Sequence, residues 1–565
     1  MKRFPFNYNP RNLTADLIAG ITTALVTIPD GLASAILAGV NPVHGLYGLM
    51  VGTPLAALTL SSQYMFVANT GAIAVAVGEA LVEYQNGSQL ITALVTLTVM
   101  VGVFQLALGF LKLGWITNYV SNAVLVGFMT GIAVLIILGQ VPYLTGFESE
   151  YSNKVLASFE TLVNPGLWHL PTILVAVITI ALIVILKRTR LAKFNMIFAL
   201  VAASALAIFT NNVLAEFGSV ELLGDIAPIP EGFPQPKLPS LSLVSALIAP
   251  AMAIGLVGLI QAAGVSRSVP NADGNYPDAS RDFLGQGIAN TASGIFQGLP
   301  IGGTMSETSV NISSGAKTRF ASLFSGLIII LLVLLFAQFI ELVALPAVGA
   351  LLVVAGYEAI KFADIEDVRD TGSGPRYTMV ITFGATLIVP IQYAVLTGVV
   401  LSILIYLYRS STDIRLMQLL PLEDGAILER EAPLSLQTGE ITILRVYGSL
   451  HFSGAVMLEQ LLPPAQETEN AVVILQLRGL DNVGSTFIQV VERYAQRLQS
   501  HGGKLYLTGV HPHVLEQLQL TETTETITPD SIFLAEETLG TSTLEAYQAA
   551  QAWLHGDAGL GLDDN

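Results

Sequence analysis

The sequence contains no cysteine and few charged residues. None of its 565 residues is Cys, which excludes disulfide frameworks, thiolate-bound zinc, iron–sulfur clusters and cysteine nucleophiles. Charged residues make up 12% of the chain, whereas soluble domains carry about 25%. No part has an excess of Lys and Arg, which argues against nucleic acid as a partner. Walker A, GxSxG and HExxH motifs are also missing, so we expect neither ATP-driven transport nor an enzyme.

The few charges are unevenly distributed. Residues 1–410 hold 18 Lys/Arg and 21 Asp/Glu, a net charge of −3, while residues 411–565 hold 7 and 21, a net charge of −14. Apolar residues make up 52% of the chain and the mean hydropathy is +0.64. The sequence therefore predicts a membrane domain over 1–410, a polar linker over 411–434, a soluble domain over 435–555 and a disordered tail over 556–565.

Apolar stretches recur along the first part of the chain. A membrane helix needs about 20 mostly apolar residues. Candidates lie at 14–31, 33–40 running into 46–62, 89–111, 117–141, 171–187, 194–211, 243–265, 283–299, 321–343, 345–360, 377–391 and 393–409. Two shorter stretches, 70–83 and 304–316, follow the irregular runs FVAN and GLPIGG. Together they give fourteen segments in two sets of seven, each with a short third member.

Charge placement predicts the orientation of these segments. Lys and Arg favour cytoplasmic loops. If the N-terminus is cytoplasmic and the segments alternate, the loops 142–170 and 212–242 lie outside, and they hold only Lys154 and Lys237 as basic residues. The first apolar stretch lacks a small-residue cleavage site, so we interpret it as a retained membrane helix and not as a signal peptide.

An odd number of segments in each half requires the halves to insert in opposite orientations. Inverted repeats with interrupted helices at matching positions are typical of secondary transporters, whose site lies at the repeat interface. The alternative is that the short segments are re-entrant loops or connectors. The matching positions favour a transporter.

The acidic tail alternates strand and helix patterns from about residue 435, which predicts a small α/β domain. His501, His511 and His513 lie on predicted loops and helix ends at a spacing unlike a metal site. Ser485 and Thr486 follow a predicted strand, where the favoured interpretation is a helix N-cap.

Three stretches and the tail resemble a known family. AGITTALVTIPDGLASAILAGVNPVHGLYG (19–48), NAVLVGFMTGIAVLIILGQVPYLTG (122–146) and GQGIANTASGIFQGLPIGGTMSETSVNISSGAKTR (285–319) are similar to the SulP sulfate-permease family. The tail resembles the STAS domain of that family. The resemblance implies a polytopic α-helical membrane protein of fourteen segments in a 7+7 inverted repeat, with core and gate domains. It also implies a homodimer in a bacterial cytoplasmic membrane, with a cytoplasmic STAS domain that supports dimerisation or regulation.

The resemblance places the third and tenth half-helices head to head. Each helix N-terminus offers four free N–H groups and about half a positive charge, so two facing ends can bind an anion without a buried cation. Thr70 and Thr304 offer hydroxyl donors, or act only as N-caps. The predicted substrate-binding residues are Asn69, Thr70, Gly71, Gly302, Gly303, Thr304 and Met305. We expect a small inorganic oxyanion, bicarbonate or sulfate.

Three departures from the family pattern suggest how transport is driven. Asp30 stands where the family usually has an uncharged residue, Gln261 where many members have an acid, and Glu307 where many have Arg. A carboxylate inside a membrane is costly and is by default a functional-site hypothesis. We expect Glu307, Asp30 and Gln261 to take part in coupling, with Na⁺ near Glu307 or a proton. Alternatively, Asp30 faces water and Glu307 pairs with Lys317 or Arg319. No other cofactor is expected.

The sequence is also compatible with two functions other than coupled transport of an inorganic anion. One is a proton-coupled nucleobase or organic anion permease, which the two acids would suit. The other is a sensor or scaffold that signals through the STAS domain. We also expect Glu79 to line the core, Glu83 to reach water and His44 to lie in a loop near the membrane surface.

Overall fold

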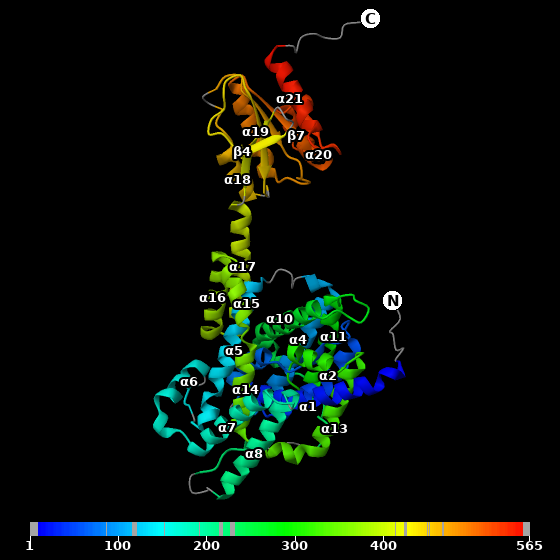
Figure 1. The fold of residues 1–565 in the computed structure, drawn as a ribbon, viewed down its shortest axis with the longest axis vertical. Coiled ribbons are helices and arrows are strands. Elements are labelled where there is room, and N and C mark those ends of the chain that lie inside the picture. The colour runs from blue at the N-terminus through cyan, green and yellow to red at the C-terminus, as the bar shows by residue number, and fades with distance from the viewer. Residues whose placement is uncertain are drawn as a thin grey trace. The chain divides into compact units, whose positions relative to one another are not determined.

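The computed structural model describes residues 9–85, 87–115, 121–147, 149–151, 153–190, 192–213, 218–226, 232–412, 414–422, 426–448, 450, 452–465 and 468–556. The chain divides into two compact units, residues 1–402 and 403–565. In Figure 1 the first unit is coloured blue to yellow-green and the second yellow to red. Each unit is described by itself.

The first unit contains a helix at each of the fourteen predicted segments. These helices are α1 (Leu13–Leu37), α2 (Val43–Thr59), α3 (Gly71–Leu81), α4 (Leu90–Phe110), α5 (Asn122–Thr145), α7 (Leu170–Lys187), α8 (Asn195–Val213), α10 (Val244–Ser268), α11 (Ala279–Ile295), α12 (Met305–Ser313), α13 (Phe320–Glu341), α14 (Leu345–Ala359), α16 (Ser373–Ile388) and α17 (Ile391–Thr412). Three short helices lie in connections, α6 (Lys154–Val163), α9 (Leu223–Ile226) and α15 (Phe362–Asp370). The fold class predicted from the sequence is confirmed.

One boundary differs from the prediction. Residues 33–37 continue α1, whereas the sequence pattern joined 33–40 to the second segment. The helix ends just before Gly39, whose φ of +69° is left-handed. A left-handed glycine is a common helix terminator because it carries no side chain to clash.

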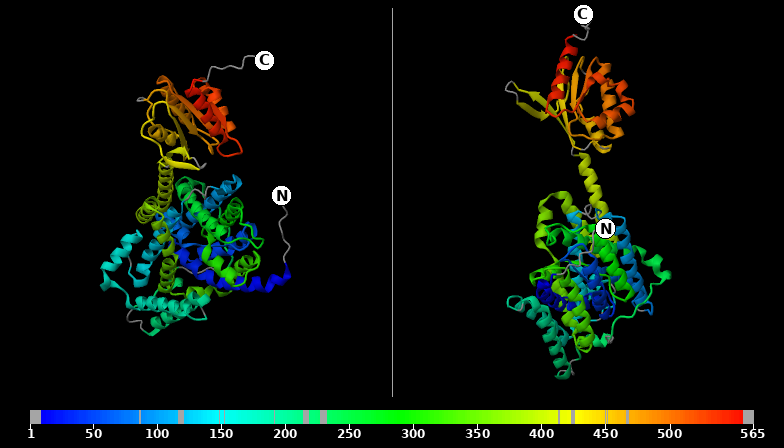
Figure 2. Two further views of the ribbon diagram at one scale, coloured as in Figure 1. Left: turned by 45° about the horizontal axis from the view of Figure 1, so that its top comes forward. Right: turned by 90° about the vertical axis from the view of Figure 1, so that its right-hand side faces the viewer.

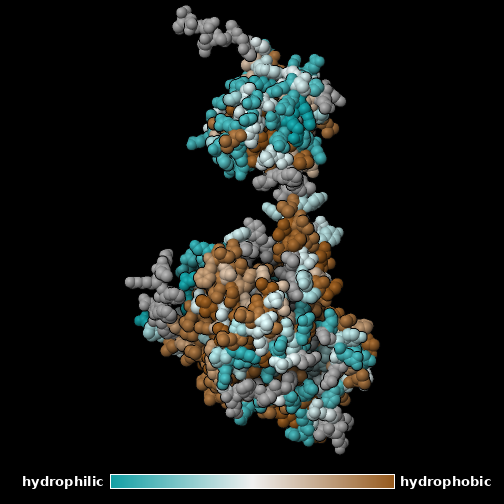
Figure 3. Space-filling view, turned by 180° about the vertical axis from the view of Figure 1, so that it is seen from behind, coloured by the Kyte–Doolittle hydropathy of each residue, from teal (hydrophilic) through white to brown (hydrophobic). Residues whose placement is uncertain are grey.

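Eight helices of the described residues are long and apolar enough to cross a membrane. Their outward faces are apolar as well. On α13, large side chains that include Leu331, Leu335 and Phe339 are exposed, and Figure 3 shows apolar residues covering much of this unit's visible face. Exposed apolar surface of this kind is suited to lipid and not to water.

The helices of the first unit pack in two groups. In one group, α11 lies against α4 and α2, α10 lies against α4, and α13 lies against α1 and α2. In the other, α5 lies against α14 and α16, and α7 lies against α8 and α14. We call them the core bundle (α1–α4, α10–α13) and the gate bundle (α5, α7, α8, α14, α16). Small residues bring helices together: a Cβ at Gly287 of α11 would lie 2.7 Å from the Leu106 nitrogen of α4, as in closely packed membrane helices.

A short two-stranded ribbon joins the two halves of the core bundle. Strand β1 (Phe66–Ala68) precedes α3, and β2 (Gly302–Thr304) precedes α12. The strands are antiparallel, with Phe66 opposite Thr304 and Ala68 opposite Gly302. Equivalent segments of the two sequence halves therefore run in opposite directions here, as an inverted repeat requires.

The second unit is an α/β domain with a six-stranded sheet in the order β4-β3-β5-β6-β7-β8. Its strands are β3 (Arg415–Pro421), β4 (Ile427–Glu431), β5 (Ile441–Tyr447), β6 (Val472–Gln476), β7 (Lys504–Val510) and β8 (Ile532–Leu534). The strands β5 to β8 are parallel to one another, and β3 is antiparallel to β4 and β5. Its helices are α18 (Phe452–Leu461), α19 (Ser485–Ser500), α20 (Pro512–Leu520) and α21 (Thr541–Leu554), seen in two orientations in Figure 2.

Two details of this unit differ from the sequence analysis. Strands β3 and β4 lie inside 411–434, which was predicted as a linker. Strand β4 is exposed along its whole length and is held by backbone pairing to β3, so it lacks the alternating pattern that identifies a half-buried strand. The N-cap of α19 is Gly484, not Ser485 or Thr486. The predicted tail 556–565 lies outside the described residues except for Gly556.

Candidate anion site between two opposed half-helices

The ribbon places the N-terminal ends of α3 and α12 toward each other. Helix α3 leaves the ribbon two residues after Ala68, and α12 leaves it directly after Thr304. Because the strands run antiparallel, the two helices depart in opposite directions and their N-termini face the middle. This is the head-to-head arrangement that the family resemblance implied.

At the end of α3, Thr70 is both a cap and a polar contact. Its Oγ1 accepts a hydrogen bond from the Ile73 nitrogen (3.2 Å) and donates one to Gln261 Oε1 of α10 (3.1 Å). Gly71 is the first residue of α3, and a Cβ there would lie 2.5 Å from Ile136 Cδ1 of α5. The start of α3 therefore touches the gate bundle directly.

Asn69 lies beside this end but points elsewhere. Its side chain is 4% exposed, and neither amide atom has a hydrogen-bond partner among the described residues. The amide lies against α1 and α2, with Nδ2 3.2 Å from where a Cβ on Gly48 would be. The amide group therefore packs between α1 and α2.

The end of α12 is packed more tightly. A Cβ on Gly303 would lie 2.8 Å from Ala262 Cα, and one on Gly302 would lie 2.8 Å from Ile73 Cδ1 and 3.4 Å from Gln261 Oε1. Only glycine leaves room for this approach of ribbon and helix. Thr304 is the N-cap residue of α12, but its side chain makes no capping hydrogen bond; its hydroxyl donates to the Phe66 carbonyl (3.3 Å). Met305 is the first residue of α12 and is half-buried.

Asp30 and Glu307, 277 positions apart in the sequence, lie together in the structure. Their carboxyl groups come within hydrogen-bonding reach of each other, and Glu307 is also within reach of the Thr304 hydroxyl. Glu307 is 5% exposed and lies in the first turn of α12. Asp30 follows Pro29 inside α1. Two carboxyl groups this close repel each other unless a proton or a cation lies between them.

Among the described residues, neither Lys317 nor Arg319 forms an ion pair with Glu307. The backbone nitrogen of Lys317 donates to Asp16 of α1, and so do the backbone nitrogen and the hydroxyl of Thr318. Arg319 donates to the Leu60 carbonyl (3.0 Å). Glu307 thus faces Asp30 and not the basic residues that follow α12.

Several polar residues that hold this region were not singled out by the sequence analysis. Asn290 of α11 accepts from the Ile301 nitrogen (2.7 Å) and donates to the Ile301 carbonyl (2.9 Å). Thr308 accepts from the Phe66 nitrogen (2.9 Å), and Thr53 donates to the Val67 carbonyl (2.8 Å). A polar residue inside an apolar helix is a usable signal, but the sequence does not indicate which distant backbone group it binds.

Glu83, His44 and the histidines of the second unit were also given predicted places. Glu83 is exposed, as expected. His44 is not in a loop: it is buried in the first turn of α2, with Nδ1 2.7 Å from the Gln297 carbonyl oxygen. In the second unit, His511 is the N-cap of α20 and His501 the C-cap of α19, and both serve helix ends.

The fold and the opposed half-helices define a membrane protein of the inverted-repeat secondary-transporter class. Comparison with known proteins gives the family. Residues 13–374 match the sulfate permease family, and residues 432–539 match the STAS domain. The chain belongs to the sulfate permease family. It is accordingly a multi-pass membrane transporter of anions and not an enzyme.

Relatives and solved structures agree with this assignment. YvdB of Bacillus subtilis is 27% identical over 520 residues, which cover 91% of this chain and 94% of YvdB. The structure of SLC26A9 superposes with a TM-score of 0.83 at 20% identity and covers 98% of this chain and 92% of that one. The transmembrane domain of a cyanobacterial bicarbonate transporter, BicA, has a TM-score of 0.59 at 24% identity and covers 70% of this chain and 98% of its own. At these identities the structures show a shared fold.

Proposed function

We propose that this protein is a secondary active transporter of a small inorganic oxyanion, with bicarbonate or sulfate as the leading substrates, coupled to Na⁺ or H⁺. The anion binds between the N-termini of α3 and α12, and the core bundle moves against the gate bundle to expose the site to each side in turn. The family is named for sulfate, and the similar structure of BicA is that of a bicarbonate transporter. The membrane is the bacterial cytoplasmic membrane, with the N-terminus and the STAS domain cytoplasmic and the protein a homodimer.

The observation that carries the coupling is the contact between Asp30 and Glu307 next to the anion site. Two ionised carboxylates beside a bound anion would place three like charges together. A proton shared by the pair, or a Na⁺ held by its oxygens with help from Gln261, removes this repulsion. Binding of a proton or Na⁺ to the Asp30–Glu307 pair strengthens binding of the anion. Binding of the anion strengthens binding of the proton or Na⁺ to the same extent.

The test is uptake of labelled sulfate and bicarbonate by the full chain in proteoliposomes. Uptake is measured with a Na⁺ gradient, a pH gradient or neither, in the wild type, Glu307→Gln and Asp30→Asn. The exposed acid Glu83 provides the matched control, Glu83→Gln. We expect wild-type uptake to rise at least fivefold with one of the gradients and Glu307→Gln to lose this dependence. Glu83→Gln should behave as the wild type.

Three outcomes would contradict parts of this proposal. An unchanged gradient dependence in Glu307→Gln and Asp30→Asn would remove the carboxyl pair from coupling. Competition by uracil or xanthine, without uptake of either anion, would favour a nucleobase permease. No flux of any of these solutes, together with a protein partner bound to the STAS domain, would favour a sensor.

A further inference from the structure

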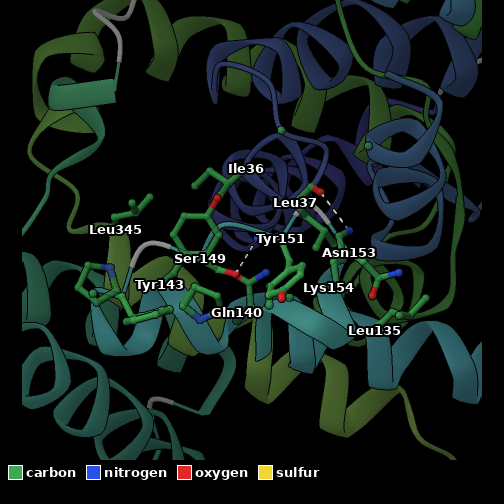
Figure 4. A pocket seen from close by; sticks show the side chains of 18 of the residues that line it. Ile36, Leu37, Leu135, Gln140, Tyr143, Ser149, Tyr151, Asn153, Lys154 and Leu345 are labelled. Atoms are coloured by element: carbon green, nitrogen blue, oxygen red, sulfur yellow. Dashed lines mark hydrogen bonds between the residues drawn. The ribbon is translucent and has the colours of Figure 1, made fainter. Parts of the chain in front are cut away.

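A large cavity lies between the two bundles at the face predicted to be outside. Its volume is about 1190 Å³, and its walls come from the C-terminal ends of α1, α3 and α5, from α6 and from the starts of α7 and α14. We call it the outer cavity. It lies at the far end of α3 from the opposed N-termini, so it is separate from the anion site described above. Figure 4 shows this cavity with its polar side chains.

Lys154 brings a positive charge to the outer cavity. It is the first residue of α6, where Asn153 caps the helix. Its Nζ donates to the Leu37 carbonyl at the end of α1 (3.4 Å), a contact drawn as a dashed line in Figure 4. Its stem passes over Gly139 of α5, where a Cβ would lie 3.2 Å from Lys154 Cδ. An ammonium has three donors, and the bond to Leu37 uses one of them.

An unpaired amide lines the same cavity. The side chain of Gln140 is 1% exposed, and neither its oxygen nor its nitrogen has a hydrogen-bond partner among the described residues. Buried polar groups are normally bonded, and one without a partner calls for an explanation such as a ligand. Gln140 Oε1 lies 3.6 Å from where a Cβ on Gly349 of α14 would be, and Gln140 of α5 and Lys154 of α6 both line the cavity.

Glu79 is the charged residue that acts on the Lys154 ammonium in the outer cavity. Burial lowers the pKa of Lys154 to about 8, and the negative charge of Glu79 on α3 works in the opposite direction. Lys154 is the only Lys or Arg among the described lining residues, and Glu79 and Glu221 are the only acids. The cavity has room for a small anion. Such an anion can interact with the Lys154 ammonium in place of the Glu79 carboxylate.

We propose that the outer cavity is a second anion site, at which a small oxyanion bound by the Lys154 ammonium and the Gln140 amide replaces Glu79 before it moves to the site between α3 and α12. The proposal rests on the proposed function. It assigns opposite roles to the two charged residues: Lys154 attracts the anion, and Glu79 competes with it.

The main test varies these charges in proteoliposomes that present the cavity face to labelled sulfate. Lys154→Met keeps the length of the stem and removes the charge, and Lys154→Arg keeps the charge. Lys237→Met is the matched control, because Lys237 is the other basic residue of the loops predicted outside. For Lys154→Met we expect KM to rise about tenfold while the maximal rate changes by less than about twofold. Lys154→Arg and Lys237→Met should stay near the wild type. An unchanged KM in Lys154→Met, or a loss confined to the maximal rate, overturns the proposal.

A second pair of variants separates binding from a merely structural ion pair. Glu79→Gln removes the competitor, so KM for sulfate should fall about threefold. Gln140→Leu should raise it by a similar factor. If Lys154 and Glu79 only clasp α6 to α3, both of their variants would shift transport in the same direction. A rise of KM in Glu79→Gln therefore also overturns the proposal.

The pH on the cavity side supplies a further readout. Sulfate stays doubly charged between pH 7 and 9, whereas Lys154 loses its charge as pH rises through its pKa of about 8. Wild-type KM should therefore rise over this range, and Lys154→Arg should flatten the profile because Arg stays protonated. The other titratable groups that line the cavity are Glu79, Tyr143, Tyr151, His169 and Glu221. A profile that is the same in Lys154→Arg contradicts the assignment.

Failure of the proposed function can be told apart from failure of this site. The solubilised full chain is heated with sulfate or with the same ionic strength of chloride, and the shift in Tm is measured. Folding of each variant is checked by size-exclusion chromatography. If no anion is transported but sulfate stabilises the wild type and not Lys154→Met, the transport proposal fails and the outer site stands. Equal stabilisation of both proteins overturns the outer site.

Discussion

Thr70 and Thr304 occupy equivalent positions in the two halves, yet they make different bonds. Thr70 caps its helix and reaches Gln261, whereas Thr304 leaves α12 uncapped by its side chain and donates to a strand carbonyl. An inverted repeat therefore preserves the backbone of the site but not the bonds of its side chains. The uncapped end of α12 keeps more free N–H groups for a ligand.

Thr70 is predicted to contribute to both stability and affinity. Thr70→Val removes the cap on Ile73 and should lower the free energy of unfolding by about 1 kcal/mol. It should also raise the KM for anion, because Gln261 loses its partner beside the site. Thr70→Ser keeps the hydroxyl and serves as the control. Thermal unfolding and sulfate uptake measure the two effects, and a Thr70→Val protein that matches Thr70→Ser in both would refute the prediction.

The sequence identified which residues are unusual but not how they meet. Asp30 and Glu307 stood out because charge is scarce inside apolar segments. That their carboxyl groups face each other follows from the packing of α1 against α12, which neither local sequence encodes. Lys154 was seen only as a basic residue of an outer loop. Its burial depends on Gly139, whose missing side chain leaves room for the lysine stem.

Among the helices of the core bundle, α3 and α1 both touch the gate bundle, and α3 does so at the candidate anion site. Helix α3 packs against α10 and α1 of the core bundle and against α5 of the gate bundle. Gly71 is one point of contact with α5, since a Cβ placed there would lie 2.5 Å from Ile136 Cδ1. The two bundles must slide past this contact when they move relative to each other. The size of the side chain at position 71 should therefore control the rate of transport.

A double-mutant cycle can test this contact. Gly71→Ala places a methyl group 2.5 Å from Ile136 Cδ1, an overlap that only movement of the isoleucine can relieve. We expect the maximal rate to fall about tenfold, since overpacking costs 1–3 kcal/mol. Ile136→Val removes Cδ1 and should restore most of the rate in the double variant. Additive losses in the two variants would show that the contact does not limit the movement.

At the scale of elements, the hydropathy of the sequence predicted most of the membrane helices but not the strands β1 and β2. Twelve of the fourteen helical segments were predicted from long apolar runs, and the short segments 70–83 and 304–316 were predicted from their matching positions in the two halves. The strands β1 and β2 were seen only as irregular runs, because three residues each are too few for a periodic pattern. Their pairing was not predicted, because the family resemblance implied only that the two half-helices meet head to head.

At the scale of the whole molecule, each unit has a hydrophobic core of its own. The core of the second unit includes Leu444, Leu475, Val491 and Leu507, all buried in and around its sheet. The sequence separated this domain by its charge, since residues 411–565 carry a net charge of −14. Its start was placed too late, because the exposed strand β4 resembles a linker in composition.

The second unit is predicted to fold without the membrane unit. A fragment of residues 414–556 should be soluble and unfold in one cooperative transition, followed by circular dichroism in urea. A matched fragment that begins at residue 435 lacks β3 and β4 and should be less stable, because β5 loses its neighbour on one side. Equal stability of the two fragments would show that β3 and β4 are appendages of the domain.

The ribbon of β1 and β2 has a consequence for the biogenesis of the protein. Phe66 and Thr304 are paired across the ribbon and are 238 positions apart in the chain. Strand β1 therefore enters the membrane long before its partner has been synthesised, and its backbone groups need another partner or water during that interval. The proposed anion site cannot form in a chain that stops short of residue 304. We therefore expect the proposed binding site to form in one late step, when the second half inserts and closes the ribbon.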